Sequence, residues 1–211
     1  MKLTKAQVAQ NRHRIIETAG RLFRQHGFEG VALADLMKAA GFTHGGFYNH
    51  FSSKEALAAE AALSGLTRSN AKLSDEVANE KRGPDSGLAK FVAGYLSSEH
   101  RDDRAGGCTI ASLACDAARE DKEIQARFAT GIEDELRIFA SCFAMGQAED
   151  EGSGSSGREL AIRLMSELVG AVILARAVVQ ANPSLSDEIL QASRRSLQDL
   201  HFSKRDPADE V

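Results

Sequence analysis

The sequence is poor in several residue types. Its 211 residues include no tryptophan, three prolines and three cysteines, and aromatic side chains make up 6% of it. Because proline breaks helices while alanine and leucine favour them, so little proline indicates a mostly helical chain. A small, odd number of cysteines is typical of free thiols rather than of a disulfide framework.

Long apolar runs are missing as well. The longest, residues 164–179, is interrupted by Glu167 and Arg176, so we expect no membrane span. The first residues are polar and lack the apolar core of a signal peptide. We therefore expect a cytoplasmic protein.

The sequence contains none of the short motifs that mark common enzyme classes. There is no phosphate-binding Walker loop, no GxSxG nucleophile elbow, no HExxH pair and no GxGxxG dinucleotide fingerprint. No spacing of Cys and His suits a zinc site. The sequence therefore predicts a protein that is not an enzyme and that holds neither a metal nor another cofactor.

Positive charge gathers at the N-terminal end, although the formal net charge of the whole chain is −4. Residues 1–54 contain eight Lys or Arg and three Asp or Glu, which gives +5 and leaves −9 for residues 55–211. A basic segment on an acidic body is typical of a protein whose first part meets a polyanion. Uneven charge also arises by chance, so charge alone leaves other interpretations open.

Apolar residues recur along the chain at spacings of three, four and seven, which is the period of helices with one buried face. Glycine, proline and capping residues divide these stretches, and we find no stretch that predicts a strand. The sequence predicts an all-α fold with helices over residues 6–25, 33–40, 44–50, 54–79, 88–99, 108–119, 124–147, 159–180 and 186–200.

Two short predicted helices are separated by a tight turn at Gly41-Phe42-Thr43. These lengths fit a helix-turn-helix, in which the first helix crosses the DNA backbone and the second enters the major groove. Other corners between two helices can have the same lengths, so the spacing by itself does not identify the motif.

The residues at this corner carry a more specific signal. The run GFTHGGFYNHFSSKEAL, residues 41–57, resembles the DNA-binding motif of the TetR family of bacterial repressors. The resemblance continues upstream through IIETAGRLFRQHGFEGVALADLMKAAG, residues 15–41. It implies a three-helix DNA-binding domain over residues 1–54 and a helical effector-binding and dimerisation domain over residues 55–203. The polar tail, residues 204–211, is expected to be disordered.

The resemblance also implies roles for single residues. The positions that match those contacting double-stranded DNA in the family are Thr43, His44, Gly45, Tyr48, Asn49, His50 and Lys54. His44 stands where Lys or Arg is frequent, and the pair Gly45-Gly46 replaces bulkier residues. Two glycines in a short helix cost about 1 kcal/mol each relative to alanine, so we expect a weakly formed helix that allows a close approach to DNA.

The rest of the chain is expected to form a homodimer and to bind a small organic effector that releases the repressor from its operator. Residues 159–180 and 186–200 are the expected interface, because the first of these helices carries more apolar surface than one monomer hides easily. The same apolar surface also suits a central core helix of the domain. Residues expected to line the effector pocket, each of which also suits a packed core, are Phe91, Tyr95, Ile110, Leu113, Phe128, Ile132, Phe139 and Met165.

Two other functions fit the same sequence. One is an activator with the same fold. The other is a helical ligand-binding or redox-sensing protein, since Cys108 and Cys115 are seven residues apart and would share a helical face. Free cysteines are more often small buried apolar residues, and a sensing thiol needs both exposure and a lowered pKa.

Overall fold

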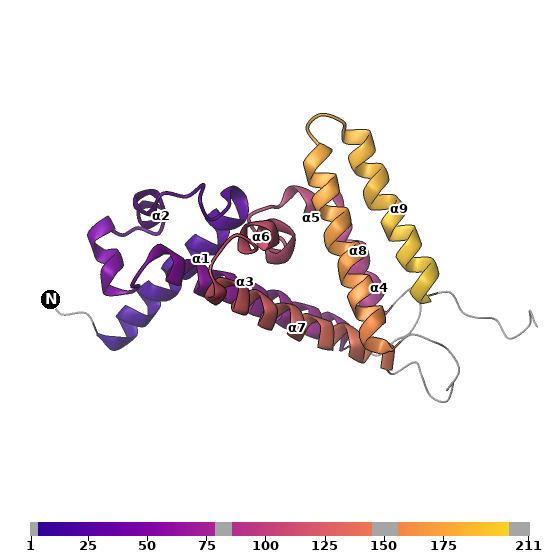
Figure 1. Cartoon of the computed structure of the whole chain (residues 1–211), viewed down its shortest axis with the longest axis horizontal. Coiled ribbons are helices and arrows are strands. Elements are labelled where there is room, and N and C mark those ends of the chain that lie inside the picture. The colour runs from indigo at the N-terminus through magenta and orange to yellow at the C-terminus, as the bar shows by residue number, and fades with distance from the viewer. Residues whose placement is uncertain (1–3, 79–85, 145–155, 203–211) are drawn as a thin grey trace, which may run out of the picture. The chain divides into compact units, whose positions relative to one another are not determined.

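The computed structural model describes residues 4–78, 86–144 and 156–202 (Figure 1). All the regular elements among these residues are helices, which confirms the all-α class. They are α1 (Lys5–His26), α2 (Leu33–Ala39), the 3₁₀-helix η1 (His44–Asn49), α3 (Lys54–Val77), α4 (Gly87–Tyr95), α5 (Ser98–Asp102), α6 (Thr109–Ala117), α7 (Lys122–Ala144), α8 (Gly157–Val178) and α9 (Pro183–Phe202). None of the helices described is long and apolar enough to cross a membrane. The predicted tail, residues 204–211, lies outside the described residues.

Side chains and glycine fix the ends of the helices. Thr4 and Gln7 form a reciprocal capping box at the start of α1. At its end Gly27 has a φ of 77° and donates its N–H to the carbonyl of Phe23 at 2.8 Å. Asp121 accepts the N–H groups of two residues in the first turn of α7, which is the role of an N-cap residue.

The stretch predicted as one helix over residues 88–99 is instead two helices, α4 and α5. Ser97 starts the second one by accepting the N–H of His100 at 3.2 Å. The imidazole Nδ1 of His100 lies 2.7 Å from the carbonyl oxygen of Tyr95, the last residue of α4. The chain therefore breaks between α4 and α5, where Ser97 caps the new helix and His100 contacts the free carbonyl of Tyr95.

The chain forms two compact units. The first contains residues 1–69 and 103–133, and the second contains residues 70–102 and 134–211. Both α3 and α7 are continuous helices that begin in the first unit and end in the second. The predicted DNA-binding domain, residues 1–54, lies entirely within the first unit, which also includes α6. That domain boundary stays a prediction.

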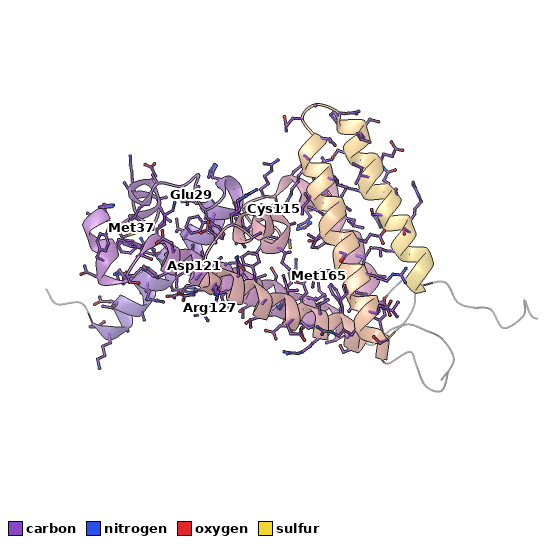
Figure 2. All side chains as sticks on the ribbon, viewed as in Figure 1. Glu29, Met37, Cys115, Asp121, Arg127 and Met165 are labelled. Atoms are coloured by element: carbon purple, nitrogen blue, oxygen red, sulfur yellow. The ribbon has the colours of Figure 1, made fainter. Side chains whose placement is uncertain are left out.

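In the first unit α1 packs against α2 and α6. Arg24, near the end of α1, is buried and its Nε donates to the carbonyl of Ala105 at 2.7 Å. Burial, reinforced by the charge of Arg68, lowers the pKa of Arg24 to about 10. The side chain of Met37 on α2 is fully buried in the same unit (Figure 2).

In the second unit α8 and α9 run side by side in opposite directions (Figure 1). Arg101 on α5 is buried and contacts Asp187 at 2.6 Å and Ser186 at 3.0 Å, both on α9. Arg176 on α8 donates to the backbone carbonyls of Arg101 and His100. These hydrogen bonds hold the α8–α9 pair against α5.

Candidate nucleic-acid interface

The turn between α2 and η1 is fixed by its backbone and by α1. Gly41 has a φ of 82°, in the region that favours glycine. The N–H of Phe42 donates to the carbonyl of Met37 at 2.8 Å. Arg14 on α1 donates to the carbonyl of Ala40 at 2.6 Å, and its guanidinium lies 4.9 Å from the centroid of the Phe42 ring. The turn is therefore tied to α1 at two points.

One side of η1 is held by stacked aromatic rings. Phe47 on η1 is fully buried, and its ring stacks on that of Phe51 with the centroids 5.6 Å apart. Arg12 on α1 lies 4.6 Å above the Phe51 ring and forms an ion pair with Glu60 on α3. The ring stack that holds the buried side of η1 is thus covered by Arg12 of α1, which is itself paired with α3.

The other side of η1 is exposed and carries most of the residues predicted to contact DNA. Tyr48 has 65% of its surface exposed, and the His44 ring lies edge-on to it with the centroids 6.2 Å apart. A Cβ added at Gly45 would meet no atom within 4 Å. We call the exposed residues of this side and its start the η1 face: Thr43, His44, Gly45, Tyr48 and Asn49.

The predicted short helix at residues 44–50 is a 3₁₀-helix that ends at Asn49. Thr43 is its N-cap residue, but the Thr43 side chain makes no capping hydrogen bond. The adjacent glycines Gly45 and Gly46 weaken helical propensity at its centre. The missing cap and the glycine pair together account for the tighter, short helix.

His50 and Lys54 lie at the edge of the η1 face and are both half-buried. Nδ1 of His50 is buried and has no hydrogen-bond partner among the described residues. Nδ1 of His50 is therefore not accessible to an outside group. Lys54 is the first residue of α3 and forms no ion pair within the described part of the chain.

The N-terminus of α3, next to Lys54, presents backbone N–H groups. Ser53 accepts one of them, from Ala56, at 3.2 Å. A hydrogen bond from the backbone of Glu55 itself, together with one from Ser53, lowers the pKa of the Glu55 carboxyl. A helix start that stabilises a carboxylate and also carries a lysine is suited to an anion such as a phosphate.

The eight residues predicted to line an effector pocket are not all in one unit. Phe91, Tyr95, Phe139 and Met165 belong to the second unit (Met165 is labelled in Figure 2), and Ile110, Leu113, Phe128 and Ile132 belong to the first. The Phe91 ring contacts both Tyr95 and Phe139, at centroid distances of 5.6 and 5.8 Å. Only the set in the second unit contains a cluster of aromatic rings.

The two cysteines proposed as a sensing pair differ in their surroundings. Cys108 is buried and its Sγ accepts the N–H of Ala111 at the start of α6, whereas Cys115 is exposed. Among the residues described, no group of His, Cys, Asp and Glu is arranged to hold a metal ion. Arg24 and Glu135 are among the buried charged residues that the sequence analysis missed. The signal that could have found them is a charged residue on the apolar stripe of a helix.

Comparison with known proteins gives one family. The family model described as "Bacterial regulatory proteins, tetR family" matches residues 15–61. The HTH-type transcriptional repressor DhaR of Mycobacterium sp. is 24% identical over 85% of this chain and 88% of its own. The HTH-type transcriptional repressor AcnR of Corynebacterium glutamicum is 33% identical over 44% of each chain.

A solved structure agrees with these matches at the level of the fold. The crystal structure of the reduced form of E. coli NemR superposes with a TM-score of 0.74 and 19% identity, covering 93% of this chain and 99% of that chain. The family match spans α2, the turn at Gly41, η1 and the start of α3. Over residues 15–61 the chain therefore matches the tetR family of bacterial regulatory proteins, whose relatives named above are helix-turn-helix transcriptional repressors, and over most of its length it shares the fold of NemR.

Proposed function

We propose that the protein is a repressor that binds its operator as a homodimer through the η1 face and leaves it when a small organic molecule binds the helical domain. The observation that carries the first part is the two-sided character of η1. Phe47 is fully buried, while Tyr48 beside it is the most exposed of the large apolar residues described. A short helix held rigidly by one side can present the other to the major groove.

Backbone contacts would come from the start of α3. The free charge of Lys54 and the N–H groups beside it suit a DNA phosphate. Arg12 and Arg14 already have partners within the protein, Glu60 and the carbonyl of Ala40. We therefore assign the positioning contact to Lys54 rather than to these two arginines.

The proposed dimer uses α8 and α9. Ile162 and Leu174 on α8 are 45% and 58% exposed, and Leu185 on α9 is 39% exposed. A Cβ added at Gly170 would meet no atom within 4 Å, so a partner helix can approach α8 closely there. An apolar face of this kind on paired helices favours a two-fold four-helix interface. In such a dimer the two η1 faces would enter successive major grooves of the DNA, which lie one helical turn, about 34–36 Å, or a multiple of this apart.

Release by an effector requires a coupling of about 1–3 kcal/mol between the two sites. Helices α3 and α7 run continuously from the first unit into the second, and Arg24 fastens α1 to the segment before α6. A ligand that shifts either helix would change the position of the η1 faces in the dimer. The aromatic residues Phe91, Tyr95 and Phe139 are the favoured part of the ligand site.

The test is an assay for binding and release on DNA taken from beside the protein's own gene. Selective binding that is reversed by a small molecule from a screen supports a ligand-released repressor. Selective binding that no ligand weakens, with transcription rising when the protein is present, would support an activator instead. Equal binding to unrelated DNA at all salt concentrations would refute the proposal.

A further inference from the structure

One acidic residue occupies a core position of α7. The buried stripe of this helix contains Ile124, Phe128, Gly131, Glu135 and Phe139, at spacings of three and four residues. Four of the five are apolar or glycine, as a buried helical face requires. Glu135 is only 6% exposed although it carries a carboxyl group.

Nothing in the described part of the chain compensates this carboxylate. Glu135 makes no hydrogen bond or ion pair with any described residue. Burial alone raises the pKa of its carboxyl to about 7. An ionised carboxylate that is buried without a partner destabilises the fold. Ionisation of Glu135 therefore costs the fold stability, whereas an external cation would supply the missing partner.

The aromatic cluster of the second unit starts one helical turn from Glu135. Phe139 lies four residues further along α7, on the same face as Glu135. Its ring contacts Phe91 at 5.8 Å, and Phe91 in turn contacts Tyr95 at 5.6 Å. Ring faces attract cations, most strongly when water is excluded. The neighbourhood thus combines a buried negative charge with several aromatic rings.

We propose that Glu135 and the ring cluster of Phe91, Tyr95 and Phe139 form a binding site for an organic cation, an amine or quaternary ammonium group on an apolar body. The inference rests on the proposed function, because it names the chemical class of the effector that releases the repressor. The carboxylate pairs with the cationic head, and the rings cover its apolar body. A carboxylate or phosphate ligand would be repelled from this site.

Three probes with the same apolar body test the chemistry: phenylbutylammonium, phenylbutanol and phenylbutanoate. Calorimetric titration of the full-length dimer should show that the ammonium binds more tightly than the alcohol and that the carboxylate does not bind. Glu135→Gln should weaken the binding of the ammonium probe by on the order of tenfold to a hundredfold and leave the affinity for the alcohol unchanged. Glu123→Gln, an exposed acid on the same helix, should change neither.

A second variant tests the rings. Phe91→Leu should reduce the preference for the ammonium over the alcohol while Glu135 remains in place. Equal affinity for ammonium and alcohol, no saturable ammonium binding, or unchanged selectivity in Glu135→Gln would each overturn the inference.

The DNA assay separates this result from the proposed function. Selective DNA binding by wild type and Glu135→Gln, without any preference for the ammonium, refutes the cation site alone. A cation preference without selective DNA binding refutes the proposed function and leaves the site standing.

Discussion

The rings of Phe47 and Phe51 stack with their centroids 5.6 Å apart and their planes at 27° to one another. Phe47 lies within η1, and Phe51 follows the C-cap residue of this helix. Their contact therefore fixes η1 by its buried side. Tyr48, next to Phe47, points away from the core and is 65% exposed. Stability and DNA binding are therefore expected to depend on neighbouring residues of the same short helix.

Replacement of these two neighbours should have separate effects. Tyr48→Ala should change the free energy of unfolding by less than about 0.5 kcal/mol, because the side chain is exposed. It should weaken operator binding by on the order of tenfold or more, through loss of a groove contact. Phe47→Ala should cost about 3–5 kcal/mol of stability. Urea unfolding and fluorescence anisotropy measure the two quantities, and normal DNA affinity in a folded Tyr48→Ala protein would remove Tyr48 from the interface.

A phosphate contact at Lys54 has a specific salt signature. Lys54→Ala should reduce the slope of log affinity against log salt concentration by about 1, and should weaken binding to all DNA sequences alike. Lys72→Ala is the control, since Lys72 is an exposed lysine further along the same helix α3. An unchanged slope in Lys54→Ala would show that this lysine does not neutralise a phosphate.

The apolar face of α8 should decide the oligomeric state. Leu174→Glu places a charge on a side chain that is 58% exposed in the single chain. The monomer should tolerate it, whereas burial of an unpaired charge in a dimer is costly. Sedimentation velocity should show a shift towards monomer for Leu174→Glu. Val8→Glu, the same kind of change on the exposed part of α1, should remain dimeric; a dimeric Leu174→Glu protein would place the interface elsewhere.

The contribution of Glu135 to the stability of the protein should fall as the pH rises towards and through 7. The folded-state pKa of Glu135, about 7, lies above its ordinary value of 4.5. Because the folded protein holds this proton more tightly than the unfolded chain does, the stabilisation is complete at low pH and is lost as the pH rises through 7. The change is on the order of 3 kcal/mol.

Glu135→Gln removes this effect, since the amide does not ionise. The melting temperature of the variant should exceed that of the wild type at about pH 8, and the difference should shrink at about pH 5. Glu123→Gln is the exposed control on the same helix. A difference that does not depend on pH would show that the carboxyl of Glu135 is not desolvated in the folded protein.

Much of the helical layout was predictable from local patterns. Apolar spacing defined the long helices, and capping residues such as Thr4 and Asp121 explain why two of them begin close to the predicted positions. The division of residues 88–99 into two helices was not predictable from apolar spacing, because Ser97 and His100 act through hydrogen bonds rather than through burial.

The sequence motif supplied the members of the candidate site, whose contacts with DNA stay a prediction, but not the geometry in which the structure holds them. The motif identified Tyr48 and Lys54 as candidates, whereas the 3₁₀ form of η1 depends on its two glycines and missing cap. Glu135 was missed because an acid within an amphipathic helix is ordinarily placed on the solvent side. Glu135 is buried because of the way α7 is rotated about its axis in the folded protein. Apolar spacing predicts this rotation only if the position of Glu135 is counted as part of the apolar stripe.

The most direct test of the central claim is the affinity of the wild-type protein for DNA from beside its own gene. It is measured by fluorescence anisotropy over a salt series, with unrelated DNA of equal length as the reference and Tyr48→Ala as the matched variant. We predict selective binding that falls linearly on logarithmic axes as salt rises, and that loses its selectivity in Tyr48→Ala. Equal affinity for a genome-selected set of fragments and for unrelated DNA at every salt concentration would contradict a sequence-specific repressor that acts through the η1 face.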